Sequence, residues 1–226
     1  MGNQQGKPLP PEIKKRVKDL GFNYSKIKGI FLTHSHADHK KSVGALSRDL
    51  KIPVYTDKEN TGNYFKHIIL QGEKRYIIDD IDTITFKLSH DAVNPLGFSF
   101  KFNDKRLTFI TDTGEITGTM YALCKVTDIL FIEANYSIEG LKNSTYTDYL
   151  KARISSSTGH LSNNQTIDLL NDLSSEESCN ISNVYLTHIS DNSNSEKAIC
   201  MDFRIYYKGR FSYTICNNGE SVKGGK

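Results

Sequence analysis

Short apolar runs alternate with amphipathic stretches along this sequence, which is the pattern of a layered α/β protein. Apolar residues spaced three or four positions apart predict helices over 11–22, 41–50, 115–126, 146–154, 162–173 and 195–203. Runs rich in β-branched and aromatic residues predict strands over 27–33, 52–57, 83–90, 97–102, 106–111, 128–135, 184–190 and 211–216. The turn residues Asn103 and Asp104 predict a hairpin between two of these strands.

Composition and length narrow the class of protein. A chain of 226 residues is long enough for one sizeable core and does not require two domains. No apolar run approaches the roughly 20 residues that a membrane span needs. The N-terminal segment lacks the apolar stretch of an export signal. We therefore expect a cytoplasmic protein that has no membrane partner.

The cysteines and the net charge restrict the class of protein less than length and composition do. The four cysteines are scattered without a CxxC pair, which favours buried free thiols in a reducing compartment. A net charge of +3 permits a polyanionic partner but does not require one.

Thr33 to His39 is the densest chemical feature of the chain, with three imidazoles and one carboxylate in THSHADH. Alternate residues of an extended segment project to the same side, so His34 and His36 are expected to converge on one metal ion. Asp38 and His39 reach a second ion as the loop turns. Imidazole and carboxylate ligands suit Zn, Mn or Fe, and the absence of thiolate ligands argues against a closed structural zinc site.

Further polar residues lie where predicted strands end or helices begin. Of the seven histidines, only His67 has no place at or beside such a junction. His160 comes just before a helix that a capping box of Ser162 and Gln165 opens. The other candidates follow apolar strands: His90, Asp112 and His188. The sequence therefore predicts one polar centre built from loops that are distant along the chain.

HSHADH resembles the HxHxDH signature of the metallo-β-lactamase superfamily, and later landmarks follow in the expected order. The resemblance implies an α/β fold, the four-layer αββα sandwich. This single domain would span 1–226, with 1–11 disordered and 217–226 a polar tail. It implies two divalent metal ions, one held by His34, His36 and His90, the other by Asp38, His39 and His188, with Asp112 bridging them.

A narrower resemblance comes from stretches such as TDTGEIT, DILFIEANY, ARISSSTGHLSN and LTHISDNSN. They are similar to a bacterial branch of double-stranded DNA exonucleases linked to mismatch repair, with tRNA 3′-processing endonucleases and phosphonate-pathway phosphodiesterases as more distant relatives. The resemblance implies a nucleic acid substrate, in particular DNA. Its members open with a pair of strands before the first helix, whereas this sequence begins nearly at that helix. We therefore expect the sandwich without its opening strands, which an incomplete gene model, a shortened natural variant or a chain that needs a partner would explain.

The mechanistic hypothesis assigns roles to four side chains. A hydroxide held between the two metals attacks phosphorus, and His160 protonates the leaving oxygen or steadies a non-bridging one. Asp38 and His160 are the catalytic candidates. Glu133 is a candidate for a carboxylate that orients a ligand histidine, and Asp91 either does the same or caps a loop.

Two other functions compete with a DNA exonuclease. The same centre suits hydrolysis of a small phosphodiester or another ester. The missing opening strands also motivate a metal-binding protein that is inactive and works through interaction. Salt-sensitive binding of nucleic acid favours the nuclease, because phosphate contacts release counterions.

Overall fold

The computed structural model of the chain describes residues 10–179 and 181–217. They form two compact units, each with its own sheet and apolar core. The first comprises the described residues up to Gln71 together with Ala92–Leu96, and the second comprises Gly72–Asp91 and the described residues from Gly97 onward. A single domain over 1–226 stays a prediction.

The first unit is built around a small parallel sheet in the order β1-β2-β3. Its elements are α1 (Pro10–Asp19), η1 (Tyr24–Lys26), β1 (Ile30–Phe31), α2 (Ala37–Lys40), α3 (Val43–Leu50), β2 (Pro53–Thr56) and β3 (Lys66–Ile69). Leu32, Val43 and Val54 are buried together, so the first turn of α3 packs on the residues of β1 and β2. This packing fixes the chain on both sides of the histidine-rich loop.

Both chain ends bear on expectations from the sequence. Helix α1 begins at Pro10, so the last two residues of the expected disordered segment 1–11 are helical. Proline lacks an N–H group that the first helical turn does not use, and its fixed φ suits this position. Residues 1–9 and 218–226 lie outside the described residues, as does most of the expected polar tail 217–226.

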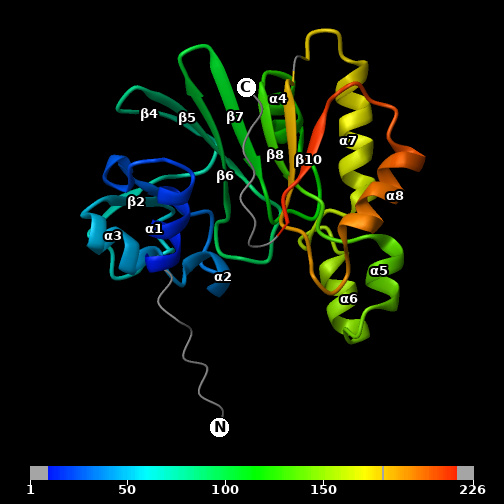
Figure 1. The fold of residues 1–226 in the computed structure, drawn as a ribbon, viewed down its shortest axis with the longest axis horizontal. Helices are drawn as coiled ribbons and strands as arrows, with labels where there is room; N and C mark the ends of the chain where they lie inside the picture. Colours follow the sequence, from blue (N-terminus) through cyan, green and yellow to red (C-terminus); the bar gives the residue numbers. More distant parts are fainter. Residues whose placement is uncertain (1–9, 180, 218–226) are drawn as a thin grey trace. The chain divides into compact units, whose positions relative to one another are not determined.

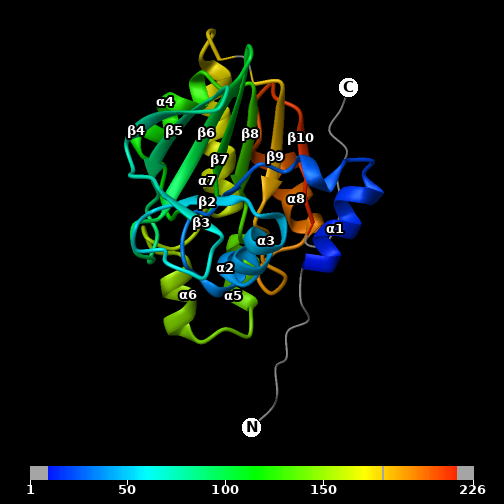
Figure 2. The same ribbon diagram turned by 90° about the vertical axis from the view of Figure 1, so that its left-hand side faces the viewer.

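The second unit carries a seven-stranded sheet in the order β10-β9-β8-β7-β6-β5-β4, which Figure 2 shows side by side. Its strands are β4 (Lys74–Ile78), β5 (Ile81–Lys87), β6 (Leu96–Phe102), β7 (Lys105–Ile110), β8 (Ile129–Glu133), β9 (Asn183–Thr187) and β10 (Tyr213–Ile215). Its helices are α4 (Gly118–Lys125), α5 (Ile138–Asn143), α6 (Asp148–Ile154), α7 (Asn163–Ser175) and α8 (Glu196–Tyr206). Strands β7 to β10 are parallel, whereas β6 pairs with β7 and β4 with β5 antiparallel.

Apolar side chains alternate between the two faces of this sheet. Ile110, Ile132 and Leu186 are fully buried in the core that α4, α7 and α8 complete (Figure 1). On the opposite face the rings of neighbouring strands stack, with centroids 4.3 Å apart for Phe109 and Phe131 and 4.7 Å for Phe131 and Tyr185. Such cross-strand pairs fix the register of the central strands. The loops that follow β7, β8 and β9 therefore start from well-anchored positions.

The carboxyl ends of these parallel strands meet at one edge of the sheet. Strand β7 ends at Ile110, β8 at Glu133 and β9 at Thr187. Figure 2 shows the arrow of β9 pointing toward this end of the sheet, where α5 and α6 lie. Crevices beside the carboxyl ends of parallel strands are the usual position of binding sites in such sheets.

Within the described residues, no helix combines the length and the apolar character needed to cross a membrane. The four cysteines are free thiols, as the sequence predicts. Cys124 and Cys179 are buried, and burial raises the pKa of the Cys124 thiol. The expectation of burial is wrong for Cys200, because α8 turns Ile199 and Phe203 to the core and leaves Cys200 on its exposed side.

An ion-pair network on the second sheet supports a prediction about stability. Asp82 Oδ1 accepts from Arg75 Nε at 2.7 Å, and Asp82 Oδ2 accepts from Arg106 Nη2 at 3.2 Å. The hydrogen bond from Arg75 and the charges of both arginines lower the pKa of Asp82. We expect Asp82→Asn to lower the free energy of unfolding at pH 7 by about 1 kcal/mol.

The pH dependence of this effect follows from the direction of the pKa shift. A carboxylate with a lowered folded-state pKa stabilises the fold above its unfolded pKa of about 3.9, and this stabilisation is lost as the pH falls through the folded value. Urea unfolding at pH 7 and at pH 2.5 should therefore show a difference between wild type and Asp82→Asn that shrinks at the lower pH. Asp104→Asn, in an exposed turn, is the control with no expected change. A difference of equal size at both pH values would contradict the role of the carboxylate charge.

Candidate metal centre

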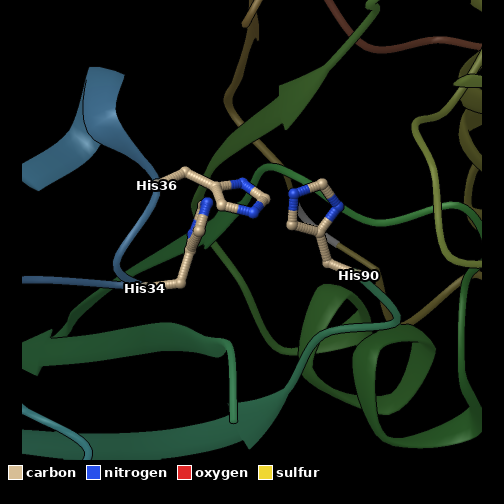
Figure 3. A group of neighbouring side chains, drawn as sticks. All are labelled: His34, His36 and His90. Carbon is tan, nitrogen blue, oxygen red and sulfur yellow. The ribbon is translucent and has the colours of Figure 1, made fainter. Parts of the chain in front are cut away.

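The first unit gathers three histidines in the loop between β1 and α3. His34 and His36 project from the segment after β1, as Figure 3 shows. The ring centroids of His34 and His36 are 4.5 Å apart, and those of His34 and His39 are 4.3 Å apart. His34 is fully buried, and Thr33 Oγ1 lies 3.0 Å from His34 Nδ1. His36 and His39 are half-buried, and imidazoles clustered at contact distance are rare as packing and typical of metal ligands.

Asp38 lies on the short helix α2, next to His39. The sequence predicts that the loop turns here, and the structure forms this turn as helix α2, which begins directly after His36. Asp38 Oδ2 is 3.6 Å from His39 Nε2, and 70% of the Asp38 side chain is exposed. The carboxylate that the sequence analysis makes both a ligand and a catalytic candidate is thus accessible from solvent.

In the second unit, Asp112 and His188 follow β7 and β9 in left-handed backbone conformations, with φ of 60° and 53°. Residues other than glycine adopt this region rarely, although aspartate and histidine do so more often than most. Asp112 is only 2% exposed, and its Oδ1 lies 3.3 Å from His188 Nε2. The two turns bring side chains from separate strands together, as the sequence predicts for these strand ends.

Glu133, the last residue of β8, is fully buried and accepts four hydrogen bonds. Its Oε1 accepts from the backbone N–H groups of Thr113 at 2.7 Å and Leu161 at 3.2 Å. Its Oε2 lies 3.1 Å from Nδ1 of both His160 and His188. One carboxylate therefore ties together the loops that carry Asp112, His160 and His188.

This arrangement sets the protonation of both imidazoles. Burial raises the pKa of Glu133, but hydrogen bonds and charge from His160 and His188 outweigh burial and hold the pKa at about 2. An ionised carboxylate only accepts hydrogen bonds, so Nδ1 of each histidine carries the proton. In the neutral imidazole, Nε2 of His188 then has its lone pair toward Asp112, as a metal ligand requires.

His90 is oriented in the same way by a different acceptor. Its Nδ1 donates to Gly159 O at 3.1 Å, and its Nε2 lies 3.7 Å from Asp112 Oδ1 and 3.5 Å from Asp91 Oδ1. Burial lowers the pKa of His90 against the raising effect of Asp112, which favours the neutral, metal-binding imidazole. A Cβ atom at Gly159 would meet Ile154 O at 2.2 Å. Only glycine at position 159 therefore lets the Gly159 carbonyl approach His90.

His160 stands between these groups, at the N-terminus of α7. Its ring centroid is 5.1 Å from that of His90 and 5.2 Å from that of His188. The capping box of Ser162 and Gln165 is present, as predicted. The N–H groups of Asn163 and Gln165 already donate to Tyr136 O and Ser162 Oγ. The helix dipole, rather than these two amides, is what α7 offers to a phosphate.

The donor atoms of the second unit fit a divalent metal ion. Ligand atoms of His90, Asp112 and His160 lie within 4.8 Å of one another, as do those of Glu133, His160 and His188. His160 belongs to both groups by distance, but its Nδ1 is already hydrogen-bonded to Glu133. Imidazole nitrogens and a carboxylate without cysteine sulfur suit an open, catalytic ion.

Two contacts at this centre were not predicted from the sequence. Asn135 Nδ2 donates to His188 O at 2.9 Å and so supports the left-handed turn of His188. Asp91, for which two roles were open, pairs with Arg153 of α6 and lies beside His90. Asp91 and Arg153 are far apart in sequence, and no local motif signals their contact.

Comparison with known proteins agrees with the fold. A family model described as the beta-lactamase superfamily domain matches residues 5–189. Exodeoxyribonuclease YycJ of Bacillus anthracis is 32% identical over 192 residues, 80% of this chain and 71% of that protein. Exodeoxyribonuclease WalJ of Streptococcus pneumoniae is 32% identical over 199 residues, 82% of this chain and 70% of that protein.

A solved structure shows the same fold at much lower identity. The metallo-β-lactamase fold protein YhfI of Bacillus subtilis matches with a TM-score of 0.64 and 14% identity, over 89% of this chain and 80% of that one. The resemblance stated from HSHADH and the expected fold family are therefore confirmed. This chain belongs to the metallo-β-lactamase superfamily and is a metal-dependent hydrolase.

Proposed function

We propose that this chain is a dinuclear phosphodiesterase that degrades DNA from an end. The observation that carries the proposal is the arrangement around Glu133, which holds two imidazoles in fixed tautomers beside Asp112. Two relatives at 32% identity are named exodeoxyribonucleases, which supports DNA as the substrate. A cytoplasmic location accords with this substrate and with four free thiols.

We assign the metal ligands from the family pattern and from the donor chemistry of each unit. His34, His36 and His90 would hold one ion, Asp38, His39 and His188 would hold the other, and Asp112 would bridge them. Zn or Mn suits this set, and Fe is compatible with it. Two such ions lower the pKa of bound water and stabilise charge that builds on a phosphate under attack.

The side chains of the second unit supply the proton transfer to the leaving group. His160 is held by Nδ1, so its Nε2 is the atom that can carry a proton to the leaving oxygen of the phosphodiester. Glu133 fixes the ring of His160 through this hydrogen bond. Removing water from this partly buried centre strengthens each of these interactions.

The proposal is tested with end-labelled double-stranded DNA and a small chromogenic phosphodiester, assayed with Mn or Zn and with a chelator. We expect metal-dependent release of short labelled products from DNA, weakened at high salt. Hydrolysis of the small phosphodiester without any activity on DNA would replace the proposed substrate. Bound metal without hydrolysis of any ester would indicate an inactive binding protein.

Replacing Glu133 by glutamine tests the proposed orientation of the ligands. Glutamine has nearly the same shape, but its amide nitrogen cannot accept the hydrogen bonds that one of the carboxylate oxygens accepts. We expect metal affinity to fall by about 10- to 100-fold, as when other partners of metal-binding histidines are lost. Affinity is measured by competition with a metal-binding dye.

The control for this variant is Glu139→Gln, at an exposed position of α5. It should bind metal as wild type does. Circular dichroism shows whether Glu133→Gln keeps the native fold. A folded Glu133→Gln protein with unchanged metal affinity would contradict the role given to Glu133.

A further inference from the structure

The C-terminal end of α6 is fixed directly against the proposed catalytic histidine. His160 N donates to Ile154 O at 2.9 Å, which closes the loop between α6 and α7. One residue earlier, Arg153 donates through Nε to the carboxylate of Asp91, the neighbour of His90. The last turn of α6 is thus held to two sides of the centre in the second unit.

Tyr149 lies one helical turn before Arg153 on the same face of α6. Residues four apart are neighbours on a helix surface, and the two Cα atoms are about 6 Å apart along the axis. Tyr149 is 81% exposed, the highest value among the exposed large hydrophobic residues of the described chain. A ring so exposed buries little apolar area in the fold and can be reached by a ligand.

Exposed hydroxyl groups follow α6 along the chain toward His160. The loop that follows α6 has the exposed residues Ser155, Ser157 and Thr158. Arginine, lysine, serine and threonine are the side chains that contact phosphate and sugar groups. An exposed ring beside them has the chemistry of a site for single-stranded nucleic acid.

We propose that Tyr149 and Arg153 form a stacking platform for an unpaired base next to the phosphodiester that is cleaved. The inference rests on the proposed function. The base stacks on the Tyr149 ring, while Arg153 and the loop hydroxyl groups contact the backbone that leads to His160. The favoured substrate is therefore a DNA end whose terminal nucleotides are unpaired, rather than a blunt duplex.

Fluorescence anisotropy with labelled single-stranded (dT)10 tests the platform while a chelator prevents cleavage. One stacked base contributes roughly 1–3 kcal/mol, so Tyr149→Ala should raise the Kd by about 5- to 100-fold. Tyr149→Phe keeps the ring and should bind within about twofold of wild type. Tyr206→Ala removes another exposed ring, on α8, and should bind as wild type does.

Two further measurements separate this inference from the proposed function. Hydrolysis of a small phosphodiester should be the same for Tyr149→Ala and wild type, because that substrate does not reach the ring. If wild type hydrolyses no phosphodiester with any metal, the proposed function fails, whereas weakened (dT)10 binding by Tyr149→Ala still supports the platform. The platform is overturned if wild type and Tyr149→Ala bind (dT)10 with equal affinity. It is also overturned if Tyr149→Ala loses as much affinity for a blunt duplex as for (dT)10.

Discussion

His160→Ala is expected to lower the turnover of DNA hydrolysis by about 10²- to 10⁴-fold, the usual contribution of a positioned general acid. The reason is geometric. The His160 ring is held through Nδ1 by the buried carboxylate of Glu133, which leaves Nε2 to serve the leaving oxygen. Glu133 keeps its contact with His188 in this variant, so the ligand side of the centre should be preserved.

Two measurements check this prediction. Metal content should match that of wild type, because His160 is not among the proposed ligands. A nitrophenolate leaving group needs little protonation, so the variant should lose much less activity on a nitrophenyl phosphodiester than on DNA. His160 does lie within ligand distance of His90 and Asp112. A variant that has lost metal would therefore make His160 a ligand and contradict its role as an acid.

Asp112→Ala is expected to abolish metal binding at the centre and to lower hydrolysis of every phosphodiester by more than about 100-fold. Losing a residue that merely orients a ligand costs about 10- to 100-fold, and a bridging ligand contributes more. Alanine is also strained by about 1–2 kcal/mol at a φ of 60°.

Asp112→Asn separates these two causes, because asparagine tolerates the left-handed conformation. It should fold like wild type and still bind metal poorly. Elemental analysis of the purified proteins measures the metal content. Full metal occupancy in Asp112→Asn would remove Asp112 from the ligand set.

The sequence predicts the long elements of the fold well, because their periodicity is unambiguous. The capping box before α7 and the apolar strand β8 are examples. Two strands, β3 and β4, and the short helix α5 were not predicted. Strand β4 lies at the sheet edge, so KRYII does not alternate cleanly between buried and exposed positions. The turn residues Asp79 and Asp80 between β4 and β5 were the local sequence signal that could have found the hairpin, because aspartate tolerates the left-handed conformation that Asp79 adopts.

In the candidate site, too, local sequence patterns predict some features, whereas features that depend on tertiary contacts were not predicted. Asp112, Glu133 and His188 could be grouped from sequence because each ends or follows a parallel strand, and such strand ends share one edge. That Glu133 serves two histidines could not be predicted, since it depends on loops joined only by tertiary contacts. The same is true of the pair between Asp91 and Arg153.

The central claim is that these ligands make the chain a metal-dependent nuclease. Digestion of end-labelled double-stranded DNA by metal-loaded wild type and by Asp112→Asn, followed over time, tests it most directly. The account predicts that wild type releases the label progressively in a chelator-sensitive reaction, and that Asp112→Asn leaves the DNA intact. Equal digestion by the two proteins would contradict the proposed centre.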